Sequence, residues 1–115
     1  MRISFIKQSN LREKSKKLTG SEDSFDDFIK KLKVADWNHP NDIKNTFSNA
    51  DIIGNDRVIF DLRGNQYRVI CQYKFVTDIK DSWVALYLCW IGTHEEYNKL
   101  CANSSHPTQY TVWDF

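Results

Sequence analysis

The fold is decided by one stretch of the chain, QYRVICQYKFV, which runs from Gln66 to Val76. Its β-branched and aromatic residues favour a long strand, and side chains along a strand point alternately to its two faces. The odd-numbered residues from Tyr67 to Phe75 are apolar or aromatic, whereas the even-numbered ones include Arg68, Gln72 and Lys74. We therefore expect one face of this strand to lie in the core and the other to present polar side chains.

Two further strands are predicted beside this stretch. Arg57 to Leu62 precedes it and is rich in β-branched and apolar residues, and Trp83 to Ile91 follows it and is almost wholly apolar. The segment Arg63-Gly64-Asn65 predicts a tight turn on one side, and Asp78 to Ser82 predicts a turn on the other. Three strands joined by short turns form an antiparallel meander.

Helices are predicted on the N-terminal side of the meander. Arg2 to Ile6 suits a short strand, and a first helix is expected from Ser9 or Asn10 to Leu18. A second helix is expected from Ser21 or Ser24, because its apolar residues recur at the spacing of one buried stripe. These residues are Phe25, Phe28, Ile29 and Leu32. Asp42 to Phe47 is a candidate third helix.

The order of these elements predicts one α+β domain over residues 1–115, with a small antiparallel sheet, N-terminal helices on one face and a short C-terminal helix. Residues 102–115 show no clear period, and their structure is left open. A hydrophobic content of 41% argues against disorder. No stretch approaches the ~20 apolar residues of a membrane span or has the pattern of a signal peptide. We therefore expect a cytoplasmic protein without a membrane partner.

The three cysteines, Cys71, Cys89 and Cys101, are predicted to be reduced. Their odd number and wide spacing fit neither a disulfide framework nor a zinc knuckle. Cys71 and Cys89 fall inside apolar runs and are expected to be small core residues, whereas Cys101 stays unassigned.

The net charge conceals a basic N-terminal segment. Over the whole chain, 16 Lys and Arg balance 15 Asp and Glu, which leaves a formal charge of +1. Residues 1–17 alone hold six basic side chains against Glu13, a local charge of +5. Near-neutrality therefore does not exclude a polyanionic partner.

The segment Thr93-His94-Glu95-Glu96 is a T-x-x-E capping box that opens the last predicted helix. His94 takes the first helical position, where free backbone N–H groups and the helix dipole favour a bound phosphate. It is a candidate for proton exchange with a substrate, and Tyr97 on the same face is a candidate for contacting a phosphate or a base. The alternative, an exposed helix-start histidine without a role, stays open.

Arg68 is the second candidate, because its face of the strand also carries Gln72 and Lys74 and suits a phosphodiester backbone. The alternative is an ordinary surface arginine. No histidine pair has the spacing of metal ligands, and the chain has no GxGxxG, P-loop, GxSxG or HExxH motif. No metal and no cofactor is predicted.

Five short motifs follow one another along the chain. They are Trp37-x2-Pro40, Asn49 to Ile53, Arg57 to Leu62, Gly64 to Ile70 and Thr93 to Tyr97. Together they resemble the HigB toxin family of bacterial type II toxin–antitoxin systems, over about residues 1–100. The most specific part is GN-x-YR from Gly64, followed by TH-x-EY from Thr93.

The resemblance implies a RelE-like fold and an endoribonuclease that cleaves mRNA, often on the ribosome. It also implies a partner, a cognate HigA-type antitoxin with a helix-turn-helix domain. Carried onto this chain, the catalytic candidates are Arg68, His94 and Tyr97, and Asn65 shapes the turn beside them. The chain departs from many family members at Asn98, where they have Asp.

Such cleavage needs no metal, because the RNA 2′-hydroxyl attacks its own phosphate. His94 is the expected proton donor or acceptor, Arg68 the stabiliser of phosphate charge, and Tyr97 the residue that positions or protonates the leaving group. The residues expected to hold RNA are Lys74, Asn65, Gln72, Arg12 and Lys16. Two alternatives stay open: a non-catalytic RNA- or ribosome-binding module, and a protein interaction domain anchored by Trp113 and Phe115.

Overall fold

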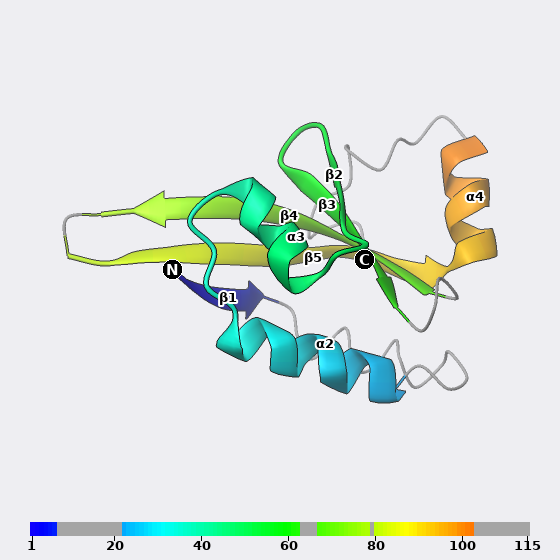
Figure 1. Cartoon of the computed structure of the whole chain (residues 1–115). Coiled ribbons are helices and arrows are strands. Elements are labelled where there is room, and N and C mark those ends of the chain that lie inside the picture. The colour runs from blue at the N-terminus through cyan, green and yellow to red at the C-terminus, as the bar shows by residue number, and fades with distance from the viewer. Residues whose placement is uncertain (7–21, 63–66, 79, 103–115) are drawn as a thin grey trace.

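A computed structural model describes residues 1–6, 22–62, 67–78 and 80–102 (Figure 1). The elements are β1 (Arg2–Ile6), α2 (Glu22–Val34), the 3-10 turn η1 (Pro40–Asp42), α3 (Ile43–Thr46), β2 (Asp51–Ile53), β3 (Arg57–Leu62), β4 (Tyr67–Thr77), β5 (Ser82–Thr93) and α4 (His94–Ala102). The predicted first helix with Arg12 and Lys16, the turn at Asn65 and the tail from residue 103 lie outside the described residues. The other predicted helices and strands are confirmed. Strand β2 was not predicted from its three residues.

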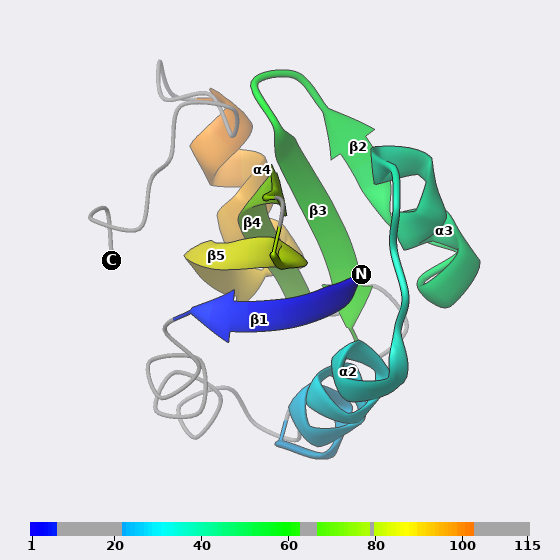
Figure 2. The same cartoon turned by 90° about the vertical axis from the view of Figure 1, so that its left-hand side faces the viewer.

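The five strands form one sheet in the order β1-β5-β4-β3-β2 (Figure 2). Strands β3, β4 and β5 pair antiparallel, which confirms the predicted meander. β1 pairs parallel to β5, from Arg2 opposite Trp83 to Ile6 opposite Tyr87. The sheet is therefore mixed, where the sequence predicted an antiparallel one. Parallel neighbours need a long connection, and most of the domain lies between these two strands.

The larger core lies between the sheet and α2. The predicted stripe of α2 is buried, with Phe28 only 1% exposed. Its ring packs at centroid distances of 5.6 Å from Phe5, 5.1 Å from Phe47 and 5.0 Å from Phe60. Aromatic contacts of this kind add to the stabilisation that burial alone provides. They fix α2 and the segment around α3 against one face of the sheet (Figure 2).

A second, smaller core lies on the opposite face of the sheet. Ile59, Ile70 and Cys89 form it, and they are at most 2% exposed. Trp90 and Tyr97 pack against this cluster, which places α4 over the face that α2 leaves uncovered. The even-numbered face of β4 is thus polar only in part, because Ile70 in its middle is fully buried.

The thiols of Cys71 and Cys89 are free and buried, as predicted. Burial, followed by the neighbouring Cys89, raises the pKa of the Cys71 thiol well above its usual range. A thiol held in its neutral form is a poor nucleophile, so Cys71 serves packing. The Cys101 side chain lies outside the described residues.

Within the described part of the chain, no helix has the length and apolar character that crossing a membrane requires.

The hairpin between β2 and β3 closes through a tight turn. Asn55 and Asp56 have φ angles of 60° and 57°, and the Arg57 N–H donates to the Gly54 carbonyl at 3.3 Å. Two successive left-handed residues define a type I′ turn, whose twist matches that of the flanking strands. The Asp56 carbonyl also accepts a hydrogen bond from the Tyr73 N–H at 2.9 Å, which ties this turn to β4.

We expect Asp56→Gly to stabilise the protein by about 1 kcal/mol, because glycine adopts the left-handed conformation without the steric cost of a Cβ. The measurement is the urea midpoint of unfolding at an unchanged slope. A lower midpoint would show that the aspartate side chain contributes more than the backbone conformation costs.

Candidate active site

Arg68 lies in β4 directly opposite Asp61 of β3. Its Nε atom is 3.0 Å from Asp61 Oδ1, and the two side chains are only 23% and 16% exposed. Both atoms are shielded from solvent, and they attract each other as an ion pair without the alignment of a hydrogen bond. The predicted polar face of β4 therefore carries a partly buried ion pair at this end.

The flat guanidinium of Arg68 also lies against an aromatic ring of α4. Its Cζ atom is 4.5 Å from the centroid of the Tyr97 ring, well within the range of a cation–π contact. The Tyr97 ring packs in turn on Trp90 of β5, with the centroids 6.2 Å apart and the planes tilted by 59°. Arg68 thus contacts the Asp61 carboxylate through Nε and the Tyr97 ring through its guanidinium, and Trp90 supports that ring.

Gly92 makes room for this arrangement. A Cβ atom at this position would lie 2.6 Å from two carbons of the Trp90 ring, closer than packed atoms approach each other. Gly92 also lies directly opposite Arg68 in the sheet. Because this position lacks a side chain, the Trp90 ring can lie over the backbone beside the arginine.

The predicted capping box is present where β5 passes into α4. The Thr93 N–H donates to Glu96 Oε1 at 2.9 Å, and the Glu96 N–H donates to Thr93 Oγ1 at 3.1 Å. These two bonds start the helix at His94, which is half-buried. The Nδ2 atom of Asn98, one turn later, is 3.3 Å from His94 Nδ1.

The register of the sheet brings the three catalytic candidates to one end of the molecule (Figure 1). Arg68 faces Gly92, which is two residues before His94 and five before Tyr97. Arg68 and Tyr97 are in contact at the junction of β4, β5 and α4, and His94 begins α4 there with its ring beside Asn98. The N-terminus of a helix is a favourable place for a phosphate.

The chain matches the family model HigB_toxin, described as the RelE-like toxic component of a toxin-antitoxin system, over residues 21–100. The chain belongs to the HigB toxin family. The match contains Arg68, His94 and Tyr97, whereas Arg12 and Lys16 precede it. A search of curated proteins found no match. As the toxic component of a toxin–antitoxin system, this HigB-family toxin has a cognate antitoxin as its partner.

Two of the candidates for RNA contact lie apart from this junction. Gln72 and Lys74 follow Arg68 on the same face of β4, toward the β4–β5 turn, and Lys74 is exposed. At about 3.4 Å per residue, Lys74 lies roughly 20 Å along the strand from Arg68. It belongs to the outer part of the β4–β5 hairpin of the toxin, which projects away from α4 (Figure 1).

Three residues of this site were not identified from the sequence of the toxin: Asp61, Trp90 and Gly92. Asp61 lies directly opposite Arg68 in the register of the structure, and the predicted turn at residues 63–65 did not give this pairing. Trp90 and Gly92 have no signal in the sequence, because their stretch of β5 is apolar on both faces.

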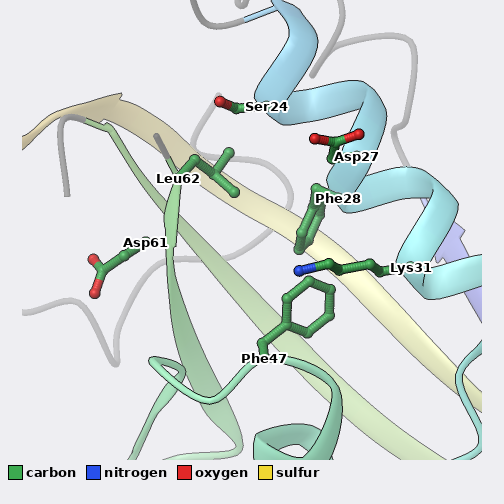
Figure 3. Close-up of a pocket in the computed structure, with 7 residues that line it drawn as sticks. All are labelled: Ser24, Asp27, Phe28, Lys31, Phe47, Asp61 and Leu62. Carbon is green, nitrogen blue, oxygen red and sulfur yellow. The ribbon is translucent and has the colours of Figure 1, made fainter. Parts of the chain in front are cut away.

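A shallow pocket of about 180 Å³ lies beside the site, between α2 and the end of β3 (Figure 3). Its lining residues are Ser24, Asp27, Phe28, Lys31, Phe47, Asp61 and Leu62. The Lys31 ammonium lies 5.7 Å from the centroid of the Phe47 ring, and the Asp61 carboxylate points away from it. None of the three catalytic candidates lines this pocket.

Among the described residues, no group of three or more His, Cys, Asp and Glu could hold a metal ion.

We expect Gly92→Ala to destabilise the toxin by about 1–3 kcal/mol, because the new methyl group must displace the Trp90 ring from its position. Chemical denaturation measures this loss. Val34→Ala is the matched control, because Val34 is 85% exposed and should change stability by less than about 0.5 kcal/mol. Equal midpoints for the two variants would contradict the packing described for Gly92.

Proposed function

We propose that this toxin is an endoribonuclease that cleaves mRNA by attack of the RNA 2′-hydroxyl on the adjacent phosphate. The observation that carries the proposal is the junction at which Arg68, stacked on Tyr97, lies beside the helix start that His94 occupies. Donors for a phosphate and groups able to move a proton are the chemistry that this reaction needs. No step of it requires a metal.

In the proposed reaction, a base takes the proton of the 2′-hydroxyl, and the 2′ oxygen forms a bond to phosphorus. The bond from phosphorus to the 5′ oxygen breaks, and an acid supplies the proton for that oxygen. The products are a 2′,3′-cyclic phosphate and a 5′-hydroxyl end. His94 serves as base or acid, and Tyr97 positions or protonates the leaving oxygen.

Arg68 stabilises the negative charge that develops on the phosphate in the transition state. Its stacked position supports this role, because a guanidinium that is already ordered loses little freedom when the phosphate binds. The N–H groups that open α4 supply further donors to the same phosphate.

RNA contacts outside the junction come from residues that bind the backbone, by charge or by hydrogen bonds, without reading its sequence. We assign this role to Lys74 and Gln72 on β4, to Asn65 in the predicted turn, and to Arg12 and Lys16 in the basic N-terminal segment. The RNA is mRNA on the ribosome, so the toxin acts in the cytoplasm. Its partner is a HigA-type antitoxin with a helix-turn-helix domain.

The first test replaces the two groups assigned to chemistry and charge. We expect His94→Gln and Arg68→Ala each to reduce RNA cleavage by about 100-fold or more, because each removes a transition-state contribution of that order. The measurements are growth arrest on expression and the appearance of 5′-hydroxyl ends on RNA, with and without ribosomes.

Asp81→Asn is the control for this test, since Asp81 is 60% exposed in an ion pair with Arg2 near the β4–β5 turn. It should leave cleavage unchanged. Full toxicity of both His94→Gln and Arg68→Ala would contradict the site. Binding of RNA or ribosomes by the wild-type toxin without new ends would favour the non-catalytic binding module instead.

Tyr97 can act through its ring or through its hydroxyl, and two variants distinguish these roles. Tyr97→Phe keeps the ring that contacts Arg68 and Trp90, whereas Tyr97→Ala removes it. If the ring matters more than the hydroxyl, Tyr97→Phe should lose no more than about 10-fold in cleavage and Tyr97→Ala about 100-fold. Equal losses in the two variants, measured as kcat on one RNA, would assign the role to the hydroxyl.

A further inference from the structure

The ion pair between Arg68 and Asp61 uses only one edge of the guanidinium. Arg68 faces Asp61 Oδ1 through Nε, at 3.0 Å. A guanidinium has five N–H donors, and the four on its two terminal nitrogens are separate from the one on Nε. The Tyr97 ring lies against the same group, with its centroid 4.5 Å from Arg68 Cζ. Asp61 and Tyr97 therefore restrict the orientation of Arg68. The ion pair is formed at Nε, and the ring contact is centred on Cζ.

We propose that Asp61 is a positioning residue of this site, which holds the Arg68 guanidinium so that its terminal nitrogens face the phosphate. The proposal rests on the ribonuclease function proposed above. The contact with Tyr97 holds the guanidinium against the ring, but a cation–π contact alone leaves the group able to rotate. The carboxylate on Nε removes this rotation, so that a fork of two nitrogens matches the geometry of a phosphate.

The surroundings of Asp61 argue for this role over simple pairing of strands. The neighbouring cross-strand pairs, Phe60 with Val69 and Ile59 with Ile70, are apolar and buried. A charged pair at low exposure must first lose its water, and an apolar pair would hold the two strands together as well. The carboxylate is therefore best explained by what it does to the arginine.

The same carboxylate predicts a distinct kinetic signature. A negative charge near the site repels a bound phosphate, so removing it does not weaken binding of the RNA in the ground state. Its removal does release the guanidinium from the orientation that the transition state needs. The loss is therefore expected in kcat, with KM unchanged or lowered.

The experiment compares Asp61→Asn with wild-type toxin and with Asp81→Asn, which removes the carboxylate of the Arg2–Asp81 pair near the β4–β5 turn. We expect Asp61→Asn to lower kcat roughly 10- to 100-fold without raising KM, and Asp81→Asn to leave kcat unchanged. Adding Asp61→Asn to Arg68→Ala should cost nothing more, because Asp61 acts through the arginine. A wild-type kcat in Asp61→Asn, or a further loss in the double variant, would overturn the proposal.

A second measurement does not depend on cleavage. Nuclear magnetic resonance relaxation should show an ordered Arg68 Nε–H bond in the wild type and in Asp81→Asn, and a more mobile one in Asp61→Asn. Equal order in all three would overturn the positioning role. If Asp61→Asn does not fold, Asp61→Glu keeps the charge and shifts it by one methylene, and a kcat equal to that of the wild type would likewise overturn it.

The two measurements separate this inference from the proposed function. If the wild-type toxin makes no 5′-hydroxyl ends with or without ribosomes, the ribonuclease proposal fails, and the order of the Arg68 side chain still decides whether Asp61 orients the arginine.

Discussion

The pairing of β4 with β5 is the constraint on which the site depends. From Thr77 opposite Ser82 to Cys71 opposite Leu88, the two strands pair residue for residue. The register then shifts, so that Ile70 faces Trp90 and Cys89 is the extra residue of a bulge. If the earlier register continued, Arg68 would face Ile91 and Gly92 would face Tyr67. The bulge therefore brings Gly92 opposite Arg68.

The same bulge decides which side chains cover the second face of the sheet. Without it, strict alternation would place Cys89 and Trp90 on opposite faces. Both instead join Ile59 and Ile70 on the face that α4 covers. Bulges commonly occur beside active sites, where they redirect a side chain, and here Trp90 becomes the support for Tyr97. The core under α4 and the stacking of Arg68 thus have one structural cause.

Sequence reasoning found those parts of the fold that follow from local patterns. The alternation in β4 placed Arg68 on the correct face, and the spacing in α2 identified its buried stripe. The capping box fixed the start of α4 at His94, because two reciprocal bonds determine it locally. Each of these features depends on residues close together in the chain.

The parts that sequence reasoning missed depend on residues far apart. The bulge lies in a stretch of β5 that is apolar on both faces, so no period reveals the slip. The parallel pairing of β1 joins strands separated by most of the chain. The role proposed for Asp61 depends on the opposite strand, where Arg68 contacts both the Asp61 carboxylate and the Tyr97 ring. The register of the strands therefore determines which residues meet in the site. The sequence identifies most of these residues but does not show how they are arranged.

The Arg68–Asp61 pair and Lys74 on the β4–β5 hairpin differ in how their charges are balanced. Arg68 is balanced by Asp61 at 3.0 Å, so this pair adds little to the long-range attraction of a polyanion. Lys74 is exposed roughly 20 Å along β4 from Arg68. On the proposed function, affinity for RNA and its dependence on salt come from the hairpin, and turnover comes from the junction with α4. A chain with a formal charge of +1 can then act on RNA, because the residue assigned to catalysis does not have to attract it from a distance.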